Sequence, residues 1–139
     1  ILAPTPQFLN STSSQGMIGE SSEFASLITL ITFGSFNIIL TGDSQSAELQ
    51  EAINNQPSGI DVLQVPHHGS KTGLNEEILD RIKPRLAVIS VGKNNRYGHP
   101  AGEIMRLLAD RGIRILRTDE DGEIEIISDG KEFLVKTTR

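Results

Sequence analysis

The 139-residue sequence contains no cysteine and no tryptophan, has a single tyrosine, and has no long hydrophobic run. The absence of cysteine excludes disulfides and thiolate metal sites. No apolar run approaches the roughly 18 residues that a membrane-spanning helix needs, so we expect no membrane segment. Basic residues are also in deficit, because 13 Lys and Arg against 18 Asp and Glu give a net charge of −5. This balance argues against binding nucleic acid through bulk positive charge and leaves a local cationic groove as the alternative.

The remaining composition is typical of one soluble globular domain, with 37% hydrophobic and 22% charged residues. Aromatic residues make up only 4%, so aliphatic side chains must fill the core. Two prolines stand near the N-terminus, and a serine-rich stretch without apolar periodicity follows them. We therefore expect residues 1–24 to form a flexible lead-in and loop, and residues 25–139 to form the folded domain.

Strands alternate with helices after residue 25. Runs of aliphatic and β-branched residues predict strands over 27–33, 37–40, 60–65 and 85–91, the first two joined by a tight turn. Apolar positions at helical spacing predict helices over 46–55, 76–83 and 100–111. The expected helix boundaries are Ser44 and Asn75 as N-caps, Pro100 as a first helical residue and Gly112 as a C-cap.

The C-terminal part of the sequence has the pattern of consecutive strands without intervening helices. Three alternating runs, 113–117, 123–128 and 132–137, are punctuated by Asp-Gly pairs and predict an antiparallel meander. Together with the alternating strands and helices, this order predicts an α/β fold with a mixed sheet, helices on one face and an antiparallel tail.

Polar side chains follow three of the predicted strands directly. Asp43 follows the strand that ends at residue 40, His67 and His68 follow the next strand, and His99 lies in the loop after the third. Ligand sites of open α/β sheets lie at the carboxyl ends of strands, so we expect these groups to meet there. A carboxylate and neutral imidazoles are standard ligands for a divalent metal.

The same loops also offer groups for an anion such as phosphate. Backbone N–H groups at Gly69 and Ser70 and the cations Lys71, Lys93 and Arg96 suit this role. Each feature has a structural alternative when taken alone: a turn aspartate, hydrogen-bonded loop histidines and a histidine beside a helix start. The expected meeting of all three loops at one sheet edge favours the functional interpretation.

The motifs at this edge are similar to those of a known family. The segments TGD (41–43), DVLQVPHHGSKT (61–72), KPRLAVISVGKNNRYGHP (83–100) and RTDEDGEIEI (117–126) resemble the C-terminal part of the metallo-β-lactamase-like domain in ComEC-type DNA-internalisation competence proteins. The resemblance runs from about residue 25 to the end. It implies an αββα sandwich, of which this chain is the second half, and a metal-dependent phosphodiesterase or nuclease acting on incoming DNA. It also implies an extracytoplasmic domain of a membrane protein.

The resemblance implies roles for single residues. Asp43 matches the metal-bridging aspartate, and His68, with His67 as the alternative, matches a late histidine ligand of zinc or manganese. His67 and His99 are implied to be catalytic, through proton transfer or phosphate binding. The residues implied to bind substrate phosphate are Ser70, Lys71, Asn95 and Tyr97. If Asp43 and His68 share one ion, their side chains must lie within about 8 Å of each other.

The chain also departs from the family pattern, because no two of its histidines have the HxHxDH spacing that supplies most of the metal ligands. We therefore expect weak metal affinity and little activity from this chain alone. The expected partners are DNA or another phosphoester as substrate, and the missing N-terminal half of the domain or a second copy to cover an apolar sheet face. Two alternatives stay open: a non-catalytic domain that binds nucleic acid or a partner, and a hydrolase of a different phosphoester.

Overall fold

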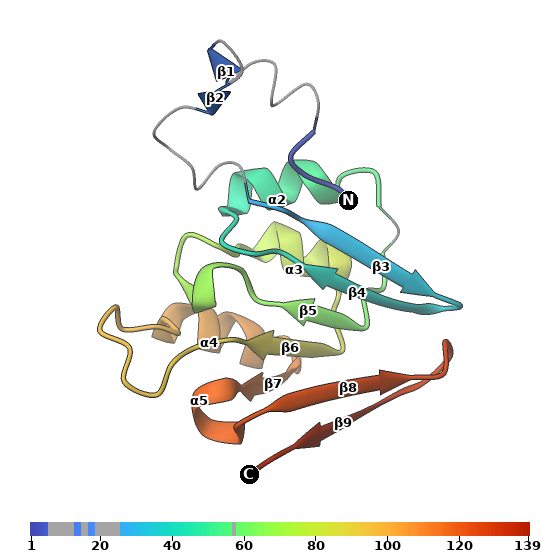
Figure 1. Cartoon of the computed structure of the whole chain (residues 1–139), viewed down its shortest axis with the longest axis vertical. Helices are drawn as coiled ribbons and strands as arrows, with labels where there is room; N and C mark the ends of the chain where they lie inside the picture. The colour runs from blue at the N-terminus through green and yellow to red at the C-terminus, as the bar shows by residue number, and fades with distance from the viewer. Residues whose placement is uncertain (6–12, 15–16, 19–25, 57) are drawn as a thin grey trace.

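The main element of the fold is a five-stranded mixed sheet with the strand order β3-β4-β5-β6-β7 (Figure 1). The computed structural model describes residues 1–5, 13–14, 17–18, 26–56 and 58–139. β3 and β4 form an antiparallel hairpin, and β4 to β7 run parallel to one another. The strands are β3 (Thr29–Phe33), β4 (Phe36–Leu40), β5 (Val62–Gln64), β6 (Leu86–Ile89) and β7 (Arg114–Arg117). The predicted α/β class with a mixed sheet is confirmed.

Three helices cover one face of this sheet, as Figure 1 shows. They are α2 (Ser46–Ile53), α3 (Glu76–Ile82) and α4 (Gly102–Ala109). Their apolar sides, including Leu49, Ile78 and Leu108, are buried in the larger core cluster with Ile39 and Leu63 of the sheet. In the sequence, each of these helices connects one parallel strand to the next. The loops that precede the helices therefore gather at the carboxyl ends of the parallel strands.

Two predicted helix starts are wrong by one or two residues. The N-cap of α2 is Gln45 and not Ser44, whose side chain is buried instead. α4 begins at Gly102 and not at Pro100, because Ala101 has an extended backbone (φ −64°, ψ 138°) and is the N-cap; its N–H donates to the carbonyl of Gly69 in another loop. The predicted cap of α3 is confirmed, since the Asn75 side chain accepts a hydrogen bond from the N–H of Ile78 at 2.9 Å.

The predicted three-stranded meander at the C-terminus is also wrong. β7 joins the main sheet parallel to β6, and a short helix, α5 (Thr118–Asp121), separates it from β8 (Ile124–Ser128) and β9 (Phe133–Thr137). Only β8 and β9 pair as an antiparallel hairpin. Alternating apolar residues predict strands correctly here, but they do not reveal with which neighbour each strand pairs.

The β8–β9 hairpin packs on the sheet face opposite the helices. Its inward residues contact a second, smaller core cluster of Phe36, Val62, Leu86 and Leu116. The β8–β9 hairpin therefore covers part of the second sheet face, which we expected to be covered entirely by a partner. Large apolar residues of β3 and β4 on that face are left exposed, namely Ile31, Phe33 and Leu40.

The described N-terminal residues make one connection to the sheet. Ala3 is buried and forms an antiparallel bridge with Ile28, just before β3. Two-residue strands β1 (Ser13–Ser14) and β2 (Met17–Ile18) pair with each other. The rest of the predicted flexible loop lies outside the described residues. Among the described helices, none has the length and apolar character to span a membrane.

Candidate functional site

The loops that carry the predicted groups meet at one sheet edge, beyond the carboxyl ends of β4, β5 and β6 (Figure 1). Asp43 Oδ1 lies 3.6 Å from His68 Nε2, so the expected proximity of these two side chains is confirmed. The His67 ring centroid lies 6.0 Å from that of His99 and 6.3 Å from that of His68. All three histidines of the chain therefore belong to this cluster, as the sequence predicted.

The orientation of His68 suits it to bind a cation. Its Nδ1 lies 2.7 Å from the carbonyl oxygen of Ser90. A carbonyl oxygen can only accept, so Nδ1 carries a hydrogen, and in the neutral imidazole the Nε2 lone pair is left free, 3.6 Å from Asp43 Oδ1. Metal-binding histidines are held by the same kind of hydrogen bond, which fixes the tautomer and the ring plane. Neighbouring ligand atoms of a tetrahedral zinc ion lie about 3.4 Å apart, close to the separation of this pair.

The PHHG turn holds both histidines in an unusual backbone conformation. His67 and His68 have φ angles of 50° and 56° in the left-handed region, which costs free energy for residues other than glycine. Hydrogen bonds to other loops hold the turn: the His67 N–H donates to the Gly42 carbonyl at 3.0 Å, and Ala101 donates to Gly69. Strain of this kind is common at functional sites, where it aims side chains in a fixed direction.

Gln64 is a positioning residue that sequence reasoning missed. Its Oε1 accepts hydrogen bonds from the backbone N–H groups of Thr41 at 3.0 Å and Gly42 at 3.3 Å. The Thr41 hydroxyl in turn donates to the Gln64 carbonyl at 2.8 Å. These bonds tie the loop that carries Asp43 to the strand that leads into the histidine turn. A signal was present, since Gln64 is a polar residue close to the end of an otherwise apolar strand.

A second missed residue, Gln45, links the start of α2 to the site. Its Nε2 lies 3.3 Å from Nδ1 of His67. The side chain makes no capping hydrogen bond on its own helix. Gln45 therefore orients the His67 ring, and an N-cap glutamine gives no sequence signal for such a role because it is not a preferred capping residue.

The loop after β6 is held by its own side chains. Asn95 Nδ2 donates to the His99 carbonyl at 2.7 Å, and its Oδ1 accepts from the His99 N–H at 3.0 Å. Asn95 thus shapes the loop, while its predicted contact with substrate stays a prediction. Burial lowers the pKa of the His99 imidazole below its ordinary value, and the neighbouring His67 and His68 lower it further. His99 is therefore mostly neutral at pH 7.

The residues expected to bind phosphate differ in accessibility. Ser70 is buried and pairs with the hydroxyl of Thr72, and its N–H donates to the His67 carbonyl. Its backbone N–H is therefore engaged within the turn, contrary to our expectation that it serves an anion. Lys71 and Tyr97 are exposed at the same edge, and their contact with substrate remains a prediction.

The described residues fit a divalent metal only in part. Asp43 and His68 offer one carboxylate oxygen and one imidazole nitrogen at a suitable separation. Within the described ranges, no group of three or more His, Asp or Glu side chains comes together to hold a metal. Zinc takes about four ligands, so these residues supply at most half of one coordination shell.

Comparison with known proteins indicates a competence-related family of the ComEC type. The chain is 43% identical over 106 residues to ComE operon protein 3 of Bacillus subtilis (strain 168). The aligned region covers 76% of this chain and 14% of that protein. It is 33% identical over 101 residues to Recombination protein 2 of Haemophilus influenzae, covering 73% of this chain and 13% of that protein. Competence protein ComA of Neisseria gonorrhoeae is 28% identical over 102 residues, with 72% and 15% covered. The chain thus spans about one seventh of these relatives. No protein-family model matches it.

Proposed function

We propose, on the premise of a competence-related family, that the chain is the C-terminal part of a metal-dependent hydrolase of the metallo-β-lactamase superfamily. In this proposal the parent protein is a phosphodiesterase or nuclease that acts on DNA during uptake. The observation that carries the proposal is the pair formed by Asp43 and His68, whose free ring nitrogen faces the carboxylate. The two side chains would hold part of a zinc or manganese site, with the other ligands supplied by other parts of the protein. A bound ion would activate water and polarise a phosphoryl oxygen.

The chain's own residues have separate tasks in this proposal. Because the pKa of His99 is lowered from 6.5, its imidazole is mostly neutral at pH 7 and can accept a proton. His67, oriented by Gln45, lies beside it and can share that proton transfer or bind phosphate. Lys71 is exposed at the same edge and can place its charge near a substrate phosphate.

The same proposal gives the chain a structural partner. Ile31, Phe33 and Leu40 are exposed on the sheet face that the β8–β9 hairpin leaves open. Contiguous exposed apolar side chains on a sheet mark a surface that another element covers. We propose that the other half of the domain covers it in the parent protein, and that a second copy can do so when this chain is alone.

Metal binding tests the ligand assignment directly. Calorimetric titration with Zn²⁺ and with Mn²⁺ should show weak binding to the chain, which Asp43→Ala and His68→Ala should each abolish. Asp110→Ala, at an exposed carboxylate beyond α4, is the matched control and should bind as the parent chain does. Unchanged metal affinity in both site variants would contradict the assignment. Strong metal-dependent phosphodiesterase activity from a monodisperse monomer would contradict the half-domain interpretation.

A second candidate function is a non-catalytic domain that binds nucleic acid on the same scaffold. The shortage of ligands among the described residues favours it. The metal titration and a DNA-binding measurement together separate the two functions. Binding of single-stranded DNA by a chain that binds neither Zn²⁺ nor Mn²⁺, at any metal concentration in which the protein stays soluble, supports the second function.

A further inference from the structure

The most exposed aromatic side chain described in the structure belongs to the candidate site. Tyr97 is 85% exposed, against 56% for Phe33, the next most exposed large aromatic residue. It is also the only tyrosine of the chain. An isolated exposed apolar side chain needs no explanation, but a ring held at the rim of a polar site has a use when its face can receive a ligand.

The Tyr97 ring makes one ring contact within the candidate site. It stacks on the His99 imidazole, with ring centroids 6.1 Å apart and planes inclined by 18°. Asn95 fixes the loop beneath by bonding both the N–H and the carbonyl of His99 and also the carbonyl of Gly92. A loop ordered by these hydrogen bonds therefore presents a flat ring that is 85% exposed, and the order of the loop lowers the entropy cost of receiving a ligand.

The loop that carries this ring is positively charged although the chain as a whole is acidic. Lys93 and Arg96 lie in the same loop and are exposed, and the segment 92–100 contains no acidic residue. A stacking ring flanked by cations is the combination by which proteins bind single-stranded nucleic acid, since the bases stack and the phosphates meet the cations.

We propose that Tyr97 is a stacking platform for an unpaired nucleobase of the substrate. The proposal rests on the proposed function and deepens it by naming the substrate class as a single-stranded nucleic acid. With a base on the outer face of Tyr97 and its phosphates near Lys93 and Arg96, the chain of the substrate leads toward His99 and from there to Asp43 and His68. Binding here uses the face of the ring and does not need the phenol hydroxyl.

The chain carries its own reporter for this contact. Because it has one tyrosine and no tryptophan, its intrinsic tyrosine fluorescence comes from Tyr97 alone. An oligothymidylate of about eight nucleotides should quench it on binding. An abasic oligomer with the same number of phosphates should bind only through charge and leave the emission unchanged. Free N-acetyltyrosinamide, titrated in parallel, corrects for light absorbed by the bases.

Variants give the affinity side of the test, measured by anisotropy of a labelled oligomer. Tyr97→Ala should weaken binding of the oligothymidylate about 5- to 150-fold, the range for loss of one stacked base. It should hardly change binding of the abasic oligomer, and Tyr97→Phe should restore tight binding because the ring is kept. Leu134→Ala, which removes an exposed apolar side chain of β9 that belongs neither to the candidate site nor to the surface proposed for the partner, is the control and should bind normally.

The outcomes separate this inference from the proposed function. If the oligothymidylate binds equally well to the parent chain and to Tyr97→Ala, the platform is wrong and the phosphodiesterase proposal stands. If Tyr97→Ala weakens both oligomers equally, the residue shapes the loop and the platform is again wrong. If neither oligomer binds the parent chain, the nucleic-acid substrate itself is wrong, and the platform falls with it.

Discussion

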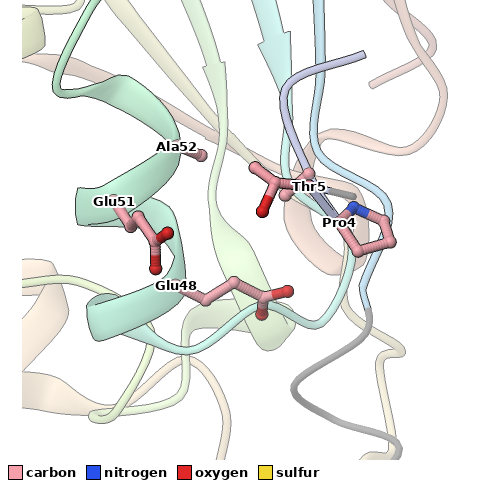
Figure 2. A pocket seen from close by; sticks show the side chains of 6 residues that line it. Pro4, Thr5, Glu48, Glu51 and Ala52 are labelled. Carbon is pink, nitrogen blue, oxygen red and sulfur yellow. The ribbon is translucent and has the colours of Figure 1, made fainter. Parts of the chain in front are cut away.

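Glu48 in the first turn of α2 offers the clearest quantitative prediction, because both of its carboxylate oxygens are shielded from water. Figure 2 shows the side chain pointing from the helix toward Pro4 and Thr5 of the N-terminal segment. Within the described part of the chain, neither carboxylate oxygen has a hydrogen-bond partner of good geometry. Burial raises the pKa of Glu48 from 4.5 to about 7; the backbone N–H of Gln45 lowers the pKa, and Glu51 raises it slightly.

The raised pKa sets the direction of the effect on stability. A proton binds Glu48 more tightly in the folded chain, so the protonated group stabilises the fold. That contribution is complete below the unfolded pKa of 4.5 and is lost as the pH rises through about 7. A pKa change of this size corresponds to about 3 kcal/mol. The side chain as a whole is only partly buried, so solvent screening reduces the expected effect to about 1–2 kcal/mol.

The test is Glu48→Gln, which keeps the shape of the side chain and removes its charge. The free energy of unfolding, from urea denaturation followed by circular dichroism, should exceed that of the parent chain by about 1–2 kcal/mol at pH 8. The difference should shrink toward zero at pH 4. Glu51→Gln, at an exposed position on the same helix, should change stability much less at both pH values. A difference that does not vary with pH, or a variant less stable at pH 8, would refute the reasoning.

Two further predictions concern packing. Leu108→Ala in α4 should lower the free energy of unfolding by about 2–5 kcal/mol, because the side chain is fully buried against the sheet; a near-neutral result would show that the helix faces another way. Gly69→Ala should destabilise the chain by at least about 1–2 kcal/mol, since Gly69 has a φ of 81° and an added Cβ would lie 2.6 Å from Cβ of Pro100. Gly92→Ala is its control, because a Cβ there meets no atom within 4 Å, and equal melting temperatures for the two variants would contradict the prediction.

The sequence predicted the location of the site well because that location depends on a simple rule. Asp43, His68 and His99 each follow a strand, and parallel neighbours bring the ends of their strands to one edge. The supporting contacts could not be predicted in the same way. Gln64 and Gln45 act through side-chain hydrogen bonds to residues 22 or 23 positions away in the sequence. Such bonds depend on the register of the sheet, which no local pattern contains.

The error at the C-terminus has a similar cause. The run 113–117 has the apolar alternation of a hairpin strand, and an Asp-Gly pair follows shortly after it, so local signals favour a turn into β8. Long-range contacts decide otherwise. β7 pairs in parallel with β6, and the Thr118 hydroxyl bonds both the N–H and the carbonyl of Val91. Thr118 thereby ties the start of α5 to the loop of the candidate site and turns the chain before the hairpin.

The incomplete set of candidate metal ligands and the exposed apolar surface lie beside each other, which argues for a single cause. Among the described residues, Asp43 and His68 supply only part of a metal coordination shell, and the exposed apolar side chain of Leu40 lies three residues before Asp43. If the exposed apolar surface and the incomplete ligand set had unrelated origins, there would be no reason for them to lie next to each other. One packed element over β3 and β4 could cover Ile31 and Leu40 and bring further ligands to Asp43 and His68. Under the proposed function, packing of the other half of the sandwich would also complete the metal site, so metal affinity should rise together with the burial of that face.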